Sequence, residues 1–181
     1  IVLWDLVDGR PATTILGIPG AVQSLSYTHD DRKLIVAGGL PGRSGLVRIY
    51  DLAARPPRLE LELTGHSDVV RAAAIDVDEQ RLVSASYAHT ARIWDLRSGK
   101  TLKVIGGHSD VVNDAAFSLD GKSVVTVSKD RSVKRFNAET GAETRTYGGM
   151  NEEILAVAIR PDGKGFVSSG IEPQLRWWEY D

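Results

Sequence analysis

Short apolar runs bounded by turn residues recur along the whole chain. Residues 111–117, 122–128 and 132–137 (VVNDAAF, KSVVTVS, SVKRFN) are separated by SLDG and KDR. The runs are rich in β-branched and aromatic residues and partly alternate, which is typical of β-strands. The polar run ETRTY at 143–147 predicts a fourth, outer strand. Because no segment shows a helical period, the pattern predicts an all-β chain.

The pattern repeats with a period of about 42 residues. HSDVV occurs unchanged at 66–70 and 108–112, and WDL occurs at 4–6 and 94–96. Each repeat starts near a glycine and ends near an aromatic residue; the glycines are Gly17, Gly65, Gly107 and Gly149, and the aromatic residues are Tyr50, Trp94, Phe136 and Trp178. Four strands per period, with Gly-His near the start and Trp-Asp near the end, are the signature of a propeller blade.

The chain therefore resembles the WD-repeat family over essentially its whole length. The resemblance implies a β-propeller of four-stranded antiparallel blades, with about four to four and a half repeats and each repeat straddling two blades. We expect residues 1–16 to supply the last two strands of a blade, 17–64, 65–106 and 107–148 to form repeats, and 149–181 an incomplete repeat. Such an array is too short for the usual ring, so we expect an open fragment of a larger propeller, cut from a longer protein.

The resemblance also implies a hydrogen-bonded set in each repeat: a His before the first strand, a Ser or Thr on the second, an Asp in the next turn and a Trp on the third. Buried donors and acceptors need partners, at about 1–3 kcal/mol each. The residues at these positions are His66, Ser84 and Trp94; His108, Thr126 and Asp130; and Ser168 and Trp178.

No repeat keeps a full set. Phe136 replaces the Trp of the repeat at 107–148, and Ala88 replaces the Asp of the repeat at 65–106. In the latter repeat we consider His89 as a substitute for the missing Asp as hydrogen-bond partner. Met150 and Glu172 stand for His and Asp in the last repeat. The first repeat keeps none of the four, so we expect apolar packing to hold the array together.

The composition excludes several classes of function. The chain has 181 residues, a net charge of −2 and no cysteine, which excludes disulfides and thiolate sites within it and argues against nucleic acid or an acidic membrane as a partner. No apolar run approaches the ~18 residues of a membrane helix. The apolar and charged fractions are typical of a soluble protein, and nothing assigns it to a compartment.

Candidate chemistry is weak throughout. His66 and His108 each begin His-Ser-Asp, but triad members meet in space from distant positions, so a framework role is favoured. The loop GGLPGRSG at 38–45 lacks the phosphate-loop lysine, and the acidic turn at 76–79 is too short for a calcium loop. We expect Trp177 to pack between blades. The sequence predicts no catalytic residue, metal or cofactor, and hence no enzyme.

We expect a non-catalytic scaffold that presents a loop-lined face to a protein or peptide, with no nucleic acid and no membrane as partner. The resemblance places the partner-binding rim at Arg43, Asp68, Arg71, Tyr87, Asp110, Asn113 and Lys129. The alternative is a regulatory or docking propeller of a larger enzyme whose catalytic part lies outside this segment. Exposed blade edges also predict self-association.

Overall fold

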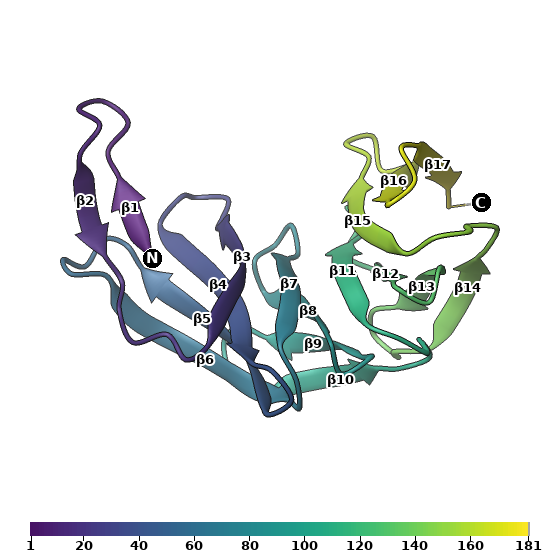
Figure 1. Ribbon diagram of the computed structural model, residues 1–181, viewed down its shortest axis with the longest axis horizontal. Helices are drawn as coiled ribbons and strands as arrows, with labels where there is room; N and C mark the ends of the chain where they lie inside the picture. Colours follow the sequence, from purple (N-terminus) through teal and green to yellow (C-terminus); the bar gives the residue numbers. More distant parts are fainter. Residues whose placement is uncertain (181) are drawn as a thin grey trace.

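The computed structural model describes residues 1–180. These residues form strands β1 to β17 and contain no helix. Strands neighbouring in the sequence pair antiparallel and form five sheets that follow one another along the chain (Figure 1). The expected all-β array of four-stranded antiparallel blades is thus confirmed.

A two-stranded hairpin comes first and consists of β1 (Val2–Trp4) and β2 (Pro11–Thr14). The first blade contains β3 (Ala21–Tyr27), β4 (Lys33–Leu40), β5 (Ser44–Asp51) and β6 (Arg58–His66). The second blade contains β7 (Val70–Ile75), β8 (Arg81–Ser86), β9 (Ala91–Asp95) and β10 (Thr101–Ile105). The third blade contains β11 (Val112–Phe117), β12 (Ser123–Ser128), β13 (Val133–Asn137) and β14 (Glu143–Tyr147). A partial blade of β15 (Ile154–Ile159), β16 (Gly165–Gly170) and β17 (Leu175–Glu179) ends the array.

The core lies between successive blades rather than inside any one sheet. Val83 and Ile93 of the second blade pack against the third blade, where Phe136 belongs to the same cluster, and all three are buried. The second strand of each full blade is buried on both faces, so the polar residues of β8 and β12 that lie within it, such as Ser84 and Thr126, need hydrogen-bond partners inside the protein. Burying one apolar side chain contributes about 1.5–3 kcal/mol, so the interfaces between blades dominate stability.

An arginine fastens the second blade to the third at the end of the molecule that carries the β7–β8 turn. Arg81 Nε donates to Asp76 Oδ2 at 2.8 Å, and its Nη2 donates to the carbonyl of Gly121 at 2.8 Å. The guanidinium also lies over the ring of Phe117, 5.0 Å from the centroid. One side chain therefore joins the β7–β8 and β11–β12 turns, and its hydrogen bond to Gly121 spans 40 residues of sequence.

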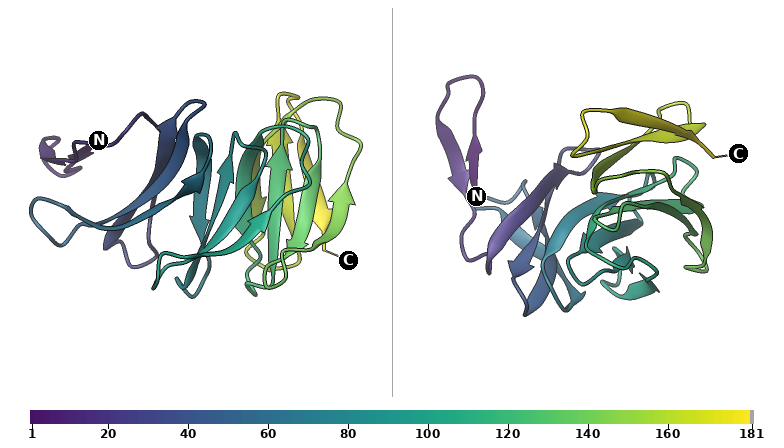
Figure 2. Two further views of the ribbon diagram at one scale, coloured as in Figure 1. Left: turned by 90° about the horizontal axis from the view of Figure 1, so that it is seen from below. Right: turned by 45° about the vertical axis from the view of Figure 1, so that its right-hand side comes forward.

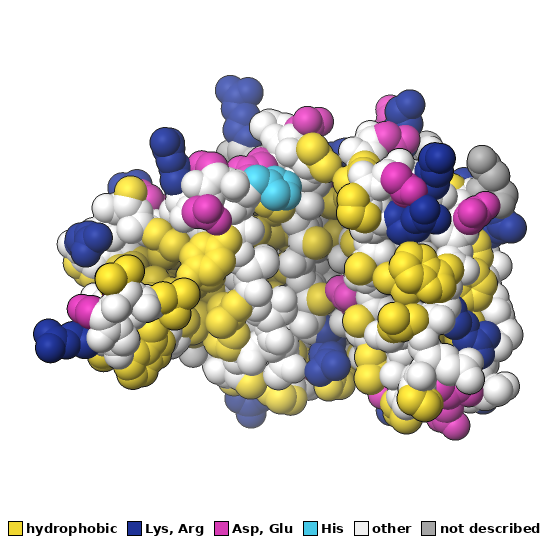
Figure 3. All heavy atoms as spheres, turned by 90° about the horizontal axis from the view of Figure 1, so that it is seen from above, with side chains coloured by type: hydrophobic (Ala, Val, Ile, Leu, Met, Phe, Trp, Pro, Cys, Tyr) yellow, Lys and Arg dark blue, Asp and Glu magenta, His cyan; other side chains and the backbone are white. Residues whose placement is uncertain are grey.

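The blades form an open arc. The hairpin and the partial blade lie at opposite ends (Figure 1), and the two further views in Figure 2 show the same separation. Figure 3 looks into the arc from its open side, where hydrophobic side chains gather on both sides of a hollow. Trp177 on β17 is 67% exposed, because no sheet covers that face of the partial blade among residues 1–180, so within these residues it does not pack between blades.

The innermost strand of every blade carries an irregularity at the same place. The register shifts between Val22 and Ser24 in β3, and at the corresponding points of β7, β11 and β15. One residue is skipped each time: Gln23, Arg71, Asn113 and Leu155. Such a bulge re-aims a side chain without ending the strand, which makes these four positions distinct from the rest of the sheet.

Candidate binding rim

The third blade brings three of the candidate polar residues into one hydrogen-bonded set. His108 lies with Nδ1 2.8 Å from Asp130 Oδ2 and Nε2 2.7 Å from Thr126 Oγ1. A carboxylate only accepts when ionised, so Nδ1 carries the proton and Nε2 accepts from the Thr126 hydroxyl. Asp130 also accepts from the backbone N–H of Ser109 at 3.0 Å, which ties the loop before β11 to the β12–β13 turn.

Burial governs the charge states of this set. Burial lowers the pKa of His108, and the hydrogen bond to Asp130 opposes that shift. For Asp130, burial alone would raise the pKa, but hydrogen bonds from Ser132 and His108 outweigh it and hold the pKa below its usual value. The set is therefore a neutral imidazole beside an ionised carboxylate. It is closed off from solvent, since Thr126 and His108 are buried, and this burial favours a framework role.

The second blade forms the same set with one member absent. His66 Nε2 lies 2.7 Å from Ser84 Oγ, and Trp94 Nε1 donates to the same oxygen at 2.8 Å. His66 Nδ1 is buried and has no hydrogen-bond partner among the described residues, so His89 does not replace the Asp that is absent at Ala88. Burial, followed by the nearby charge of Arg92, lowers the pKa of His66 to about 3.

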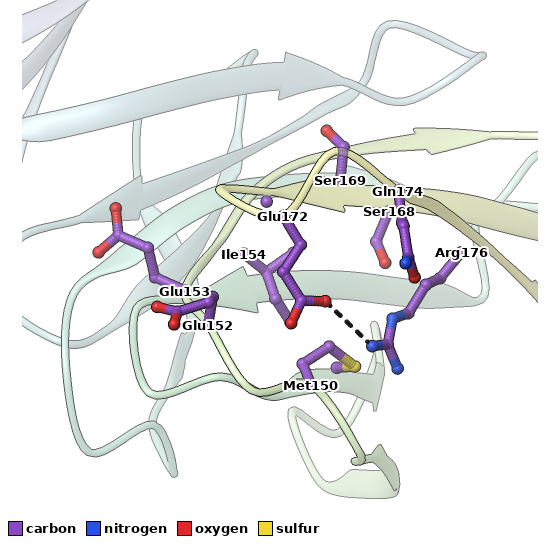
Figure 4. A pocket seen from close by; sticks show the side chains of 10 residues that line it. Met150, Glu152, Glu153, Ile154, Ser168, Ser169, Glu172, Gln174 and Arg176 are labelled. Carbon is purple, nitrogen blue, oxygen red and sulfur yellow. Dashed lines mark hydrogen bonds and ion pairs between the residues drawn. The ribbon is translucent and has the colours of Figure 1, made fainter.

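The partial blade keeps only the Ser–Trp contact, in which Trp178 Nε1 donates to Ser168 Oγ at 2.9 Å. Figure 4 shows the pocket that Met150 lines where a histidine stands in the other repeats. Beside it, Arg176 pairs with Glu172 at 3.2 Å and donates to the carbonyl of Gly149 at 2.7 Å. The ion pair and this hydrogen bond occupy the Arg176 and Glu172 side chains. We therefore interpret the pocket as a modified form of the hydrogen-bonded set of the other repeats.

Two serines outside the predicted set hold the rim loops. Ser86 Oγ donates to the carbonyl oxygens of Asp68 and Val69, at 2.9 and 3.0 Å. Ser128 Oγ does the same for Asp110 and Val111 in the third blade, at 3.3 and 2.8 Å. The signal was present in the repeated SAS and TVS, where a serine follows the framework Ser84 or Thr126 by two residues.

Three of the seven rim candidates are exposed on neighbouring turns. Arg43 lies in the β4–β5 turn, Tyr87 in the β8–β9 turn and Lys129 in the β12–β13 turn. The last two turns close in the same way: the backbone N–H of Tyr87 donates to the Val69 carbonyl, and that of Lys129 donates to the Val111 carbonyl, both at 3.0 Å. The blades thus present equivalent turns side by side.

The two aspartates of the rim accept hydrogen bonds from backbone N–H groups of the rim loops. Asp68 Oδ1 accepts from the backbone N–H groups of Val69 at 2.7 Å and Gly42 at 2.9 Å. Asp110 Oδ1 accepts from Val111 N–H at 2.7 Å. Their carboxylates are therefore partly satisfied by backbone donors and are less available to a partner than the cations beside them.

The remaining two candidates occupy the bulges of β7 and β11. Asn113 is 8% exposed and donates through Nδ2 to the carbonyl of Ile154 at 2.8 Å, so it joins the third blade to the partial blade instead of facing a partner. Arg71 is half-buried, with Nη1 3.2 Å from Gln23 Oε1 and its guanidinium 5.5 Å from the centroid of the Tyr87 ring.

The candidate polar residues do not gather into a metal-type cluster. No group of three or more His, Cys, Asp or Glu side chains within residues 1–180 is placed to hold a metal ion. The Asp68 carboxylate of the His-Ser-Asp triplet faces backbone donors, and the Asp110 carboxylate does the same. Over the same residues there is no helix of the length and hydropathy needed to cross a membrane.

The comparison with protein families agrees with this geometry. The family model described as "WD domain, G-beta repeat" matches residues 57–95 and 99–137. Each match begins in the turn before the outer strand of one blade and ends at the third strand of the next.

Curated proteins with similar sequences match about half of the chain. Autophagy-related protein 16 of Arabidopsis thaliana is 31% identical over 100 residues, which are 54% of this chain and 18% of that protein. The Target of rapamycin complex subunit LST8 of Saccharomyces cerevisiae is 28% identical over 95 residues, 52% of this chain and 30% of that protein. The Serine-threonine kinase receptor-associated protein of Mus musculus is 31% identical over 93 residues, 51% of this chain and 25% of that protein. The matches span less than a third of each relative.

Proposed function

The chain belongs to the WD-repeat family, and from that premise we propose that it is a non-catalytic scaffold that binds a protein or peptide segment on its rim. The observation that carries the proposal is the rim itself: equivalent turns of three successive blades expose Arg43, Tyr87 and Lys129 beside Arg71. Arginine and tyrosine are residue types that anchor protein interfaces. The turns are held by serine and aspartate contacts, so partner binding costs little ordering entropy.

The names of two relatives support a role in protein assemblies. One is a subunit of a complex and another is receptor-associated. A second proposal follows from the same names: the segment docks or regulates an enzyme within a larger assembly, the enzyme being another protein or another part of the same one. Both proposals place the contact on the rim.

Site-specific photo-crosslinking tests the rim. A benzophenone amino acid replaces Lys129 on the rim in one variant and Leu102 on the outer strand β10 in the matched control; both side chains are exposed. We expect a defined covalent adduct from the Lys129 variant in extract of the source cells, and none from the Leu102 variant. Equal adducts from both positions, or none from Lys129, would overturn the proposal. Mass spectrometry of the adduct tests the docking alternative, which requires an enzyme chain in it.

A further inference from the structure

Arg71 carries a charge that the described residues leave without an ion pair. Its guanidinium makes one hydrogen bond, from Nη1 to Gln23 Oε1, and no carboxylate of residues 1–180 lies within ion-pair distance of it. Its Nε is buried and lacks an acceptor. Nη2 also makes no hydrogen bond among the described residues and is not buried, so it is the donor of this side chain that an incoming acceptor can reach.

The surroundings orient this guanidinium. Gln23, at the bulge of the neighbouring inner strand, fixes one edge of it, and the ring of Tyr87 supports it 5.5 Å away. Stacking on an aromatic ring leaves the planar fork of an arginine free to form paired hydrogen bonds at its edge. A carboxylate is the side chain that matches this fork with two parallel hydrogen bonds.

The Asp114 carboxylate, whose charge interacts with Arg71, is already engaged. Asp114, on β11 next to Asn113, accepts from the backbone N–H of Ala115 at 2.8 Å and of Val157 at 3.0 Å. Burial raises the pKa of Asp114, and its two backbone hydrogen bonds and the charge of Arg71 only partly oppose that shift. Arg71 therefore acts on Asp114 from a distance and keeps its own hydrogen-bonding edge unfilled.

The other charged groups of the rim divide by sign. Asp68 accepts from the backbone N–H groups of Val69 and of Gly42 in the β4–β5 turn, and Asp110 accepts from that of Val111. The cations behave differently, because Arg43, Lys129 and Arg131 form no ion pair within residues 1–180. The rim over the first three blades thus offers cations without an ion pair, beside two carboxylates that each accept backbone hydrogen bonds through Oδ1.

Resting on the proposed function, we infer that the rim binds an acidic peptide segment, with one Asp or Glu carboxylate seated on the Arg71–Tyr87 pair. Arg43, Lys129 and Arg131 flank that seat and attract further acidic residues of the same segment. The exposed Glu152 and the half-buried Glu153, in the loop before β15, repel an acidic segment and confine it to the first three blades.

Fluorescence anisotropy of the full chain tests the inference with defined probes. The probe is a fluorescein-labelled peptide of alternating Glu and Ser, and the comparison peptides carry Gln or Lys in place of Glu. We expect the Glu peptide to bind at least about tenfold more tightly than the Gln peptide at low salt, and the Lys peptide not to bind.

Variants separate the seat from general charge. Arg71→Gln should weaken binding of the Glu peptide about tenfold, and Arg71→Lys should recover part of it, since the charge returns without the fork. The control Arg97→Gln removes the same charge from the exposed β9–β10 turn and should leave affinity within about twofold. Tyr87→Ala, at an exposed position outside the core, should weaken binding several-fold and serves as the second variant if Arg71→Gln alters the urea midpoint.

Three results would overturn the inference: no binding of the Glu peptide at about 1 mM, equal binding of the Gln peptide, or equal losses for Arg71→Gln and Arg97→Gln. If any of these occurs while Lys129 still yields a specific crosslink, the partner chemistry is wrong and the rim scaffold stands. If the Lys129 crosslink also fails, the proposed function falls with it.

Discussion

Replacing Ala88 with aspartate should complete the hydrogen-bonded set of the second blade. The third blade shows where the new carboxylate would lie, because Asp130 occupies the equivalent turn. The backbones match: Ala88 N–H donates to Ser86 Oγ at 3.1 Å, and Asp130 N–H donates to Ser128 Oγ at 3.0 Å. The following residues, His89 and Arg131, have φ angles of 61° and 67°.

The magnitude follows from the donors that gain an acceptor. His66 Nδ1 is buried without a partner among the described residues, whereas its counterpart His108 Nδ1 lies 2.8 Å from Asp130. An unsatisfied buried group costs about 1–3 kcal/mol, and a new hydrogen bond contributes about 0.5–1.5 kcal/mol net. Partial desolvation of the carboxylate offsets some of this gain. We expect Ala88→Asp to raise the free energy of unfolding by about 0.5–1.5 kcal/mol.

Urea unfolding at a pH of about 7.5, above the ordinary histidine pKa, measures the effect. Thermal melting is a second readout, in which about 1 kcal/mol corresponds to about 2–4 °C for a chain of this size. The matched control places the substitution in a His66→Leu background, where the carboxylate meets no imidazole and most of the gain should vanish. The reverse change, Asp130→Ala, should cost about 1–3 kcal/mol. An unchanged or lower midpoint for Ala88→Asp, or the same gain in the wild-type and His66→Leu backgrounds, refutes the reasoning.

Three further predictions follow from other contacts. The folded-state pKa of His66, about 3, lies below the ordinary unfolded value of about 6.5, so the unfolded chain takes up the proton first. The free energy of unfolding should therefore fall as pH drops from about 6.5, by up to about 1.4 kcal/mol per pH unit. His66→Phe should flatten that slope between about pH 6 and 4.5, and identical slopes for the wild-type chain and the variant contradict this. Arg81→Gln should lower the free energy of unfolding in urea by about 1–3 kcal/mol, because it leaves the Gly121 carbonyl without its donor and uncovers Phe117. The control Arg97→Gln should lower it by less than about 0.5 kcal/mol, and equal losses for the two variants would show that the Arg81 contacts do not join the blades. The exposed face of the partial blade should drive self-association, so Trp177→Ser should lower the apparent mass in light scattering at high concentration; a wild-type chain that stays monomeric there rules this out.

The architecture was predictable because the repeat carries its own evidence at several levels. The unchanged HSDVV at 66–70 and 108–112 set the period, and turn residues between β-rich runs marked the strands. Local propensity, turn residues and the apolar pattern all favoured the same blade. A fold can be predicted from a sequence when these independent signals agree. The departures from the pattern, Ala88 and Phe136, were visible by the same alignment of repeats.

The rim was less predictable, because burial there depends on the neighbouring blade. Arg71 and Asn113 hold equivalent positions in successive repeats, and the repeat alone treats them alike. Asn113 is short enough to reach the Ile154 carbonyl of the next inner strand, whereas the long side chain of Arg71 extends to Gln23 and Tyr87. The exposure of Trp177 was unpredictable for a related reason: it depends on whether another sheet packs against β17, and the residues of β17 alone do not determine that.

The bulge shared by the four inner strands has a consequence for how such an array diversifies. It places Gln23, Arg71, Asn113 and Leu155, which differ in charge and polarity, at one structural position. The strand continues on both sides of the bulge whatever residue occupies it. Mutation can therefore exchange an amide, a cation or an apolar group there while the blade-to-blade core stays intact. Each duplicated blade thereby acquires its own contact at a shared position: Asn113 joins the third blade to the partial blade, whereas Arg71 reaches Gln23 and Tyr87.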